Sequence, residues 1–165
     1  MFKKMFGKKE EVTVTNKEVV LAPVTGELVS LEEVPDPTFS EKMMGDGIAI
    51  KPTEGTFVAP VSGEIVNLFP TKHAIGILSE AGVEYLLHIG LETVSLEGQG
   101  FEAHVKQGDK VKAGDKLVTV DLDFVAEKAA TITPLVITNE TQSIDKVDSK
   151  SVIKGETTVL TVQVK

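Results

Sequence analysis

The sequence contains no cysteine, no tryptophan and no arginine among its 165 residues. Without cysteine, the chain has neither disulfides nor a thiol nucleophile. All 17 basic residues are lysine and the net charge is −8. Proteins that bind nucleic acid usually carry a basic surface and use the planar guanidinium of arginine, so nucleic acid is not an expected partner. No apolar run approaches 18 residues and no secretory segment is present, so we expect a cytoplasmic protein without a membrane-spanning helix.

The first residues differ from the rest of the chain in charge and pattern. Four lysines lie within residues 1–9, where two methionines and two phenylalanines share one face at helical spacing. Two interpretations are open: a weak peripheral contact of residues 1–9 with an anionic membrane, or a frayed terminus kept in solution by its charge. We expect residues 1–18 to be a flexible leader and residues 19–165 to form a single domain.

A short internal repeat indicates a duplicated β unit. Residues 22–31 recur as residues 59–68, and seven of the ten positions are identical. Gly-Asp pairs at 108–109 and 114–115 mark turns, and residues 159–164 alternate as a strand does. Short strands separated by frequent turn signals predict an all-β sandwich or barrel.

Helical signals are few. The segment Thr38–Glu41 has the pattern of a capping box, with Gly45 as a helix stop. Asp123 is a candidate cap for a second short helix that ends near Ala130. We therefore expect one or two very short helices.

Two histidines occupy positions that a hairpin would bring together. If Ser79–Gly82 is a four-residue loop, Leu78 pairs with Val83 and His73 becomes the direct cross-strand neighbour of His88, with Cβ atoms about 5 Å apart. A two-residue loop would leave the histidines diagonal on one face. A three-residue loop would place them on opposite faces.

Three interpretations of the pair are open: packing, half of a zinc site, or phosphoryl and acid–base chemistry. A neutral imidazole is a good nucleophile toward phosphorus, and a second histidine can donate to the phosphoryl oxygens. Thr71 could fix the tautomer of His73 or bind a phosphoryl oxygen, and the carbonyl of Gly90 could hold the second ring nitrogen of His88. The zinc interpretation lacks ligands, because a catalytic zinc needs three and His104 lies in a charged stretch that predicts an exposed residue.

Several segments together resemble a known family. From about residue 19 to the C-terminus, the chain resembles the glucose-class IIA component of the bacterial phosphoenolpyruvate-dependent sugar phosphotransferase system. The resemblance implies an antiparallel sandwich of two half-barrel-like sheets with a duplicated β motif. The segments that carry it are residues 42–47, 70–74, 87–94 and 98–101.

The resemblance also implies a function. The family accepts a phosphoryl group from the histidine phosphocarrier protein on the residue that matches His88, and passes it to a cysteine of a IIB domain. The match gives His73 the role of phosphoryl stabiliser, Thr71 that of its hydrogen-bonding neighbour, and Gly90 that of orienting His88. Because this chain has no cysteine, the IIB domain must lie on another chain. The resemblance does not name the sugar, because permeases of this class for glucose, N-acetylglucosamine, maltose and trehalose can all accept a IIA component of this kind.

The family docks its partners through an apolar ring around a recessed histidine, with acidic groups outside the ring. No cofactor is required, although His73 and His88 could share a regulatory zinc with a carboxylate of a partner. We expect a monomer. The matching ring residues are Phe39, Met43, Met44, Phe69 and Val94, and the matching acidic residues are Asp36, Asp46 and Glu92.

Three other classes of protein are alternatives to a phosphocarrier. One is a regulatory binding protein whose phosphorylation state is read by transporters or kinases. A zinc peptidase of related fold would need a His-x-His motif, which is absent. A lipoyl or biotinyl carrier would present a lysine at a hairpin tip, whereas Lys42 follows the predicted capping box.

Overall fold

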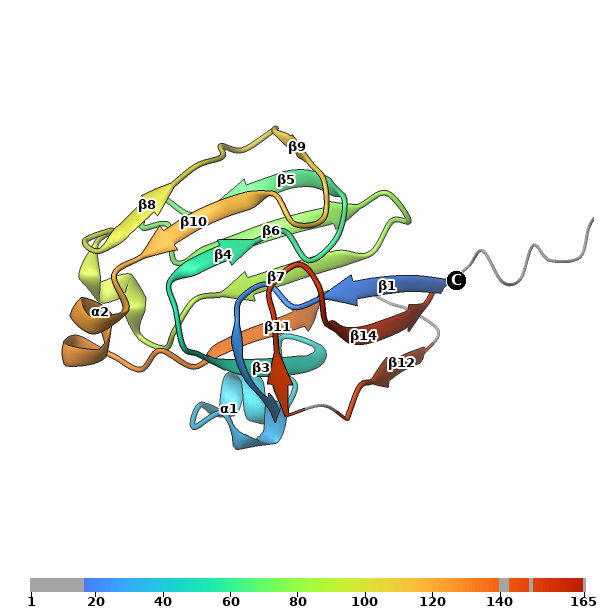
Figure 1. The fold of residues 1–165 in the computed structure, drawn as a ribbon, viewed down its shortest axis with the longest axis horizontal. Helices are drawn as coiled ribbons and strands as arrows, with labels where there is room; N and C mark the ends of the chain where they lie inside the picture. The colour runs from blue at the N-terminus through green and yellow to red at the C-terminus, as the bar shows by residue number, and fades with distance from the viewer. Residues whose placement is uncertain (1–16, 140–142, 149, 165) are drawn as a thin grey trace, which may run out of the picture.

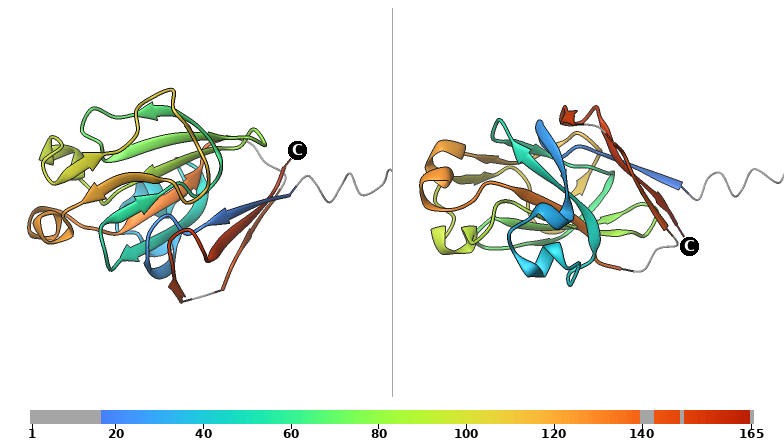
Figure 2. Two further views of the ribbon diagram at one scale, coloured as in Figure 1. Left: turned by 45° about the horizontal axis from the view of Figure 1, so that its top comes forward. Right: turned by 90° about the horizontal axis from the view of Figure 1, so that it is seen from below.

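The computed structural model describes residues 17–139, 143–148 and 150–164, which form an all-β protein (Figures 1 and 2). Eight strands make one large antiparallel sheet in the order β13-β2-β3-β11-β7-β6-β5-β9, and two three-stranded sheets have the orders β4-β10-β8 and β1-β14-β12. The strands are β1 (Lys17–Leu21), β2 (Gly26–Ser30), β3 (Asp46–Pro52), β4 (Thr56–Val58), β5 (Gly63–Leu68), β6 (Ala74–Ser79), β7 (Glu84–His88), β8 (Phe101–Ala103), β9 (Lys110–Val111), β10 (Lys116–Val120), β11 (Thr133–Ile137), β12 (Ser143–Lys146), β13 (Ser151–Val152) and β14 (Thr158–Gln163). The helical segments are η2 (Leu31–Glu33), α1 (Pro37–Ser40), η3 (Thr93–Leu96) and α2 (Leu122–Lys128).

Both small sheets pack against one face of the large sheet around a shared hydrophobic core. The large sheet contributes Ile75 and Leu87, the β4-β10-β8 sheet contributes Phe57 and Leu117, and β14 contributes Leu160, all of them fully buried. Burial of such side chains is the main favourable term in folding. The prediction of an antiparallel sandwich with very short helices is confirmed.

A second, smaller cluster covers the other face of the large sheet. It contains Leu31 from η2, Phe39 from α1, Ala49 from β3 and Val136 from β11, with Leu86 of β7 packed against it. In Figure 1, α1 lies beside β3 at the bottom of the molecule. The centre of the large sheet is therefore buried on both sides.

The internal repeat corresponds to two equivalent corners of the large sheet. Gly26 begins β2 and Gly63 begins β5, and the backbone of the neighbouring strand passes close to both. A Cβ atom at Gly26 would lie 2.2 Å from the carbonyl oxygen of Lys51, and one at Gly63 would lie 2.2 Å from that of Leu78. Glycine is needed at both corners because any side chain there would collide with backbone.

Both predicted helix caps are two residues too late. Asp36 caps α1 by accepting a hydrogen bond from the backbone N–H of Thr38 at 3.0 Å, so Thr38 is not the cap. Pro37 explains the difference, because proline favours the first helical position and keeps the preceding residue extended. In α2 the cap is Asp121 rather than Asp123, which lies inside the first turn.

The first described strand begins before the predicted domain boundary at residue 19. Lys17 and Glu18, assigned above to the leader, form β1 and pair with β14. The predicted membrane contact of residues 1–9 lies outside the described residues. Over the part of the chain that the structure describes, no helix is long and apolar enough to span a membrane.

A buried hydrogen bond ties β1 to the large sheet. The hydroxyl of Tyr85, which is buried in the core, donates to a carboxylate oxygen of Glu18 at 2.5 Å. Burial raises the pKa of Glu18, and the hydrogen bond from Tyr85 offsets this only in part. The contact that holds β1 is therefore weaker when the Glu18 carboxyl group is charged, because burial disfavours the charged form.

Replacement of Glu18 tests this contact. A carboxyl whose pKa is raised on folding contributes its stability below the unfolded pKa and loses it as the pH rises through the folded pKa. We expect the free energy of unfolding of Glu18→Gln, relative to wild type, to increase from pH 4.5 to about pH 7. Urea unfolding at several pH values measures it, with the exposed Glu27→Gln as control. An unchanged difference across this range would contradict the prediction.

Candidate functional site

His88 ends the central strand β7, which lies between β11 and β6. Tyr85 and Leu87 enter the core, so alternation turns Leu86 and His88 toward the opposite face of the sheet. Nδ1 of His88 lies 2.7 Å from the carbonyl oxygen of Gly90. Because a carbonyl oxygen only accepts, Nδ1 must carry a proton, and in the neutral ring the free lone pair is on Nε2.

The predicted register of the β6–β7 hairpin is wrong by one residue. Ala74, not His73, pairs with His88. The backbone N–H of Ser79 donates to the carbonyl of Val83 across a three-residue loop. Such a loop was expected to place the two histidines on opposite faces. The rings nevertheless lie side by side, with centroids 5.0 Å apart and planes at 81°.

The rings meet because His73 lies outside the strand. It precedes Ala74, the first residue of β6, and follows a turn closed by a hydrogen bond from the N–H of Lys72 to the carbonyl of Phe69. Lys72 adopts the left-handed conformation, with φ of 62°. Strand alternation therefore does not apply at His73, and the turn directs its ring toward His88.

Thr71 contacts His73 as expected, although from the turn rather than from a strand. Its Oγ1 lies 2.5 Å from Nδ1 of His73. A threonine hydroxyl can donate or accept, but only donation leaves the proton of the neutral His73 ring on Nε2. In that tautomer, both histidine rings have Nδ1 engaged and Nε2 free for a ligand.

Two phenylalanines pack against the histidine rings. Phe69 meets His73 edge-on at a centroid distance of 5.4 Å, and Phe39 lies 5.1 Å from His88. Phe39 is only 3% exposed, so the prediction that it forms part of an exposed ring is wrong. It belongs to the second hydrophobic cluster and packs against the ring of His88.

The other predicted ring residues are exposed around the site. Met43 and Met44 lie in the turn after α1, which ends before them, and not in the helix predicted to continue to Gly45. Exposed apolar groups of this kind suit protein contacts, and methionine adapts to different partners. The exposed fractions are 71% for Met43, 54% for Val94, 41% for Met44 and 36% for Phe69.

The predicted acidic residues differ in their surroundings. Asp36 is engaged as the cap of α1. Asp46 forms ion pairs with Lys146 at 2.8 Å and Lys42 at 3.9 Å, so its charge is largely compensated within the chain. Glu92 is exposed, and its side chain makes no cap hydrogen bond to η3. Of the three, Glu92 therefore has the carboxylate most available to a partner.

Burial keeps both imidazoles neutral near pH 7. It lowers the pKa of His73 to about 4, with a further contribution from the neighbouring His88. Burial also lowers the pKa of His88, and the hydrogen bond to Gly90 and the charge of Asp36 oppose this in part. The site thus presents uncharged rings, as a nitrogen nucleophile requires.

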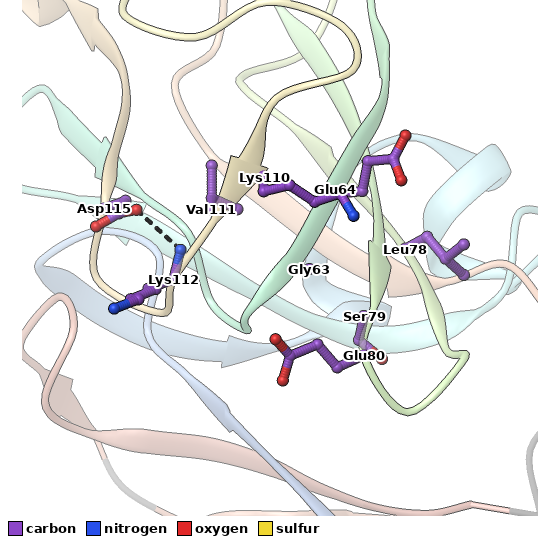
Figure 3. Close-up of a pocket in the computed structure, with 9 residues that line it drawn as sticks. All are labelled: Gly63, Glu64, Leu78, Ser79, Glu80, Lys110, Val111, Lys112 and Asp115. Atoms are coloured by element: carbon purple, nitrogen blue, oxygen red, sulfur yellow. Dashed lines mark hydrogen bonds between the residues drawn. The ribbon is translucent and has the colours of Figure 1, made fainter.

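Other parts of the described chain offer no comparable chemistry. His104 is exposed, as expected, and its Nε2 lies 2.7 Å from Oγ1 of Thr119. Within the described ranges, no group of three or more histidine, aspartate or glutamate side chains could hold a metal. A hollow of about 400 Å³ lies beside β9, at the far end of β6 from His73, and Figure 3 draws the residues that line it. Lysines and carboxylates line it together, including Lys110 and Glu64, which pair across strands β9 and β5.

Sequence reasoning missed two residues of the site, Lys72 and Thr93. The Pro-Thr dipeptide before Lys72 is a local signal that the chain turns there before β6 begins. Thr93 is fully buried, and its methyl group lies beside Gly90, three residues earlier in the chain. No local pattern indicates that contact.

Comparison with known proteins agrees with this fold. A family model described as "phosphoenolpyruvate-dependent sugar phosphotransferase system, EIIA 1" matches residues 18–143. A glucose-specific EIIA component from Bacillus cereus is 55% identical over the full length of both chains, and one from Halalkalibacterium halodurans is 53% identical over 99% of each. The solved structure of the glucose permease IIA from Mycoplasma capricolum superposes with a TM-score of 0.83 at 45% identity, covering 96% of this chain and 99% of that one.

The fold and the site together define an all-β protein built around a recessed pair of neutral histidines. With the matches above, it is a component of a sugar phosphotransferase system. The chain belongs to the EIIA 1 family of the phosphoenolpyruvate-dependent sugar phosphotransferase system.

The left-handed conformation of Lys72 generates one prediction. Outside glycine, asparagine and aspartate, this conformation costs about 1–2 kcal/mol, and it is least tolerated by β-branched residues. Lys72→Asn, which removes the charge but accepts the conformation, should retain stability and the contact between the rings. Lys72→Val should be less stable than Lys72→Asn by about 1–2 kcal/mol and should move His73 away. Urea unfolding and nuclear Overhauser effects between the two rings measure this, and equal behaviour of the two variants would refute it.

The lowered pKa of His73 generates a prediction about how stability depends on pH. A base whose pKa falls on folding stabilises the protein fully above its unfolded pKa of 6.5, and this contribution is lost as the pH falls toward 4. The full loss corresponds to about 3 kcal/mol. NMR titration should find His73 protonating near pH 4. Unfolding of His73→Gln should depend less steeply on pH in this range, whereas titration of His73 near 6.5 would show that the ring is not desolvated.

Proposed function

We propose that this protein is a phosphocarrier that accepts a phosphoryl group on Nε2 of His88 and passes it on during sugar uptake. The supporting observation is the hydrogen bond from Nδ1 of His88 to the carbonyl of Gly90, since it leaves the lone pair on Nε2. The apolar surface around the ring suits transient docking of a donor and then an acceptor. The EIIA relatives, named as glucose-specific, support glucose as the sugar.

The proposed donor is the phosphohistidine of the histidine phosphocarrier protein. Nε2 of His88 attacks the phosphorus atom while the nitrogen–phosphorus bond of the donor breaks, and the donor nitrogen keeps that electron pair. In the second step, the thiolate of a IIB cysteine attacks phosphorus and the bond to His88 breaks. Both steps need in-line positioning and modest stabilisation of the equatorial oxygens.

His73 and Thr71 are the residues we propose for that stabilisation. If the hydroxyl of Thr71 donates to Nδ1 of His73, then Nε2 of His73 carries the proton and can donate to a phosphoryl oxygen. The ring centroids lie 5.0 Å apart, so a phosphoryl group on His88 would lie beside the ring of His73. Two imidazoles are an incomplete zinc site, so a regulatory zinc would need further ligands from a partner.

The relay is tested by intact-protein mass. Incubation with phosphoenolpyruvate, enzyme I and the histidine phosphocarrier protein should add about 80 Da in an acid-labile bond. His88→Ala should abolish this gain. His73→Gln should still be loaded on His88 but should transfer to a glucose IIB domain about 100-fold more slowly, because it lacks the imidazole donor.

Thr119→Val is a matched control, because it removes only the contact with the exposed His104. It should load and transfer at wild-type rates. A mass gain that survives in His88→Ala would exclude His88 as the acceptor. Normal onward transfer by His73→Gln would remove the role assigned to His73.

A further inference from the structure

Three consecutive peptide groups beyond His88 are each fixed by a hydrogen bond to another part of the chain. The N–H of Ile89 donates to the carbonyl of His73 at 2.7 Å. The carbonyl of Ile89 accepts from the hydroxyl of Thr93 at 2.6 Å. The N–H of Leu91 donates to the carbonyl of Ala130 at 3.0 Å. The carbonyl of Gly90 lies between these contacts and bonds the ring of His88.

Planarity of the peptide bond links the last contact to the histidine. The carbonyl of Gly90 and the N–H of Leu91 belong to one planar trans peptide, so they point in opposite directions. Because the N–H is bonded to Ala130, the carbonyl is turned the other way, onto Nδ1 of His88. The segment after α2 thereby fixes one end of this peptide.

Packing leaves Gly90 little freedom to rotate. It has φ of 77°, and a Cβ atom there would lie 2.6 Å from the carbonyl oxygen of Ala130 and 2.7 Å from the methyl group of Thr93. Thr93 is fully buried, so its methyl group and hydroxyl have no alternative partner in solvent. Of its two branches, the hydroxyl fixes the Ile89 peptide group by its hydrogen bond, whereas the methyl only fills space beside Gly90.

We propose that Thr93 is a positioning residue that, together with the Leu91–Ala130 bridge, holds the Gly90 carbonyl on Nδ1 of His88 and so keeps the lone pair of His88 on Nε2. The kinetic consequence rests on the proposed phosphocarrier function, but the effect on the tautomer does not. Thr93 touches neither the imidazole nor the phosphoryl group in this scheme and acts through Gly90.

Thr93→Val tests the hydroxyl with little change of shape. A methyl carbon requires about 3.3–3.6 Å from a carbonyl oxygen, in place of the 2.6 Å hydrogen bond, so the peptide must shift and the bond to His88 weakens. Long-range ¹H–¹⁵N spectra of the histidine rings should show His88 moving from the single Nδ1–H tautomer to a mixture. The rate of loading from the phosphorylated histidine phosphocarrier protein should fall about tenfold.

Thr93→Ser is the matched control, since it keeps the hydroxyl and removes only the methyl group. It should retain the wild-type tautomer and load within about twofold of the wild-type rate. If Thr93→Val does not fold, Thr93→Ala leaves space instead of a clash and carries the same expectation. A wild-type tautomer in the valine or alanine variant, or a lost tautomer in the serine variant, overturns the positioning role.

The two readouts separate this inference from the proposed function. If wild type is never phosphorylated but Thr93→Val shifts the tautomer, the phosphocarrier proposal fails and the positioning role stands. If wild type is phosphorylated and Thr93→Val changes neither spectrum nor rate, the positioning role is wrong and the phosphocarrier proposal stands.

Discussion

The hydrogen bond between Nδ1 of His88 and the carbonyl of Gly90 is the contact on which the rest of the site depends. It determines which ring nitrogen is free, because a carbonyl cannot donate. This hydrogen bond leaves a lone pair on Nε2 only while the ring is neutral, since a protonated imidazole has no lone pair. The packing of Phe39 and the second hydrophobic cluster supplies that condition by lowering the pKa of His88 through burial. The same apolar packing thus holds the His88 ring in place and keeps it uncharged.

This arrangement occurs in only one of the two equivalent halves of the large sheet. Ile48 and Ile75 pair with the central residues Leu135 and Leu87, which makes the two halves of the large sheet equivalent. One step further along, Gly47 pairs with Val136 where Ala74 pairs with His88. Val136 therefore occupies in one half the position of His88 in the other, and Asp46 occupies that of His73. Val136 is fully buried in one cluster with Phe39, whereas His88 stays partly exposed.

Much of the fold could be predicted from the sequence because its signals are local. Glycine at the two equivalent corners, Gly-Asp turns and strand alternation each depend on a few adjacent residues. The register of the β6–β7 hairpin could not be predicted in this way, because loops of three and four residues fit the same turn composition. The two histidines still meet, through the left-handed turn at Lys72, so the proximity was predicted correctly for a wrong reason. The contacts of Gly90 and Leu91 with Ala130, which is far away in the sequence, depend on tertiary structure alone.

The absence of arginine acquires a physical meaning in the proposed relay. A carrier must release its phosphoryl group as readily as it accepts it, so the free energies of the two states must stay close. A fixed cation 4 Å from a phosphoryl charge, in surroundings of intermediate dielectric, would contribute about 4 kcal/mol. That energy would bias the equilibrium toward retention about a thousandfold. Neutral donors such as His73 stabilise the transferring group without this bias. In the proposed relay, a guanidinium that stabilises the transferring group would come from a docked partner and leave with it, which couples transfer to the encounter.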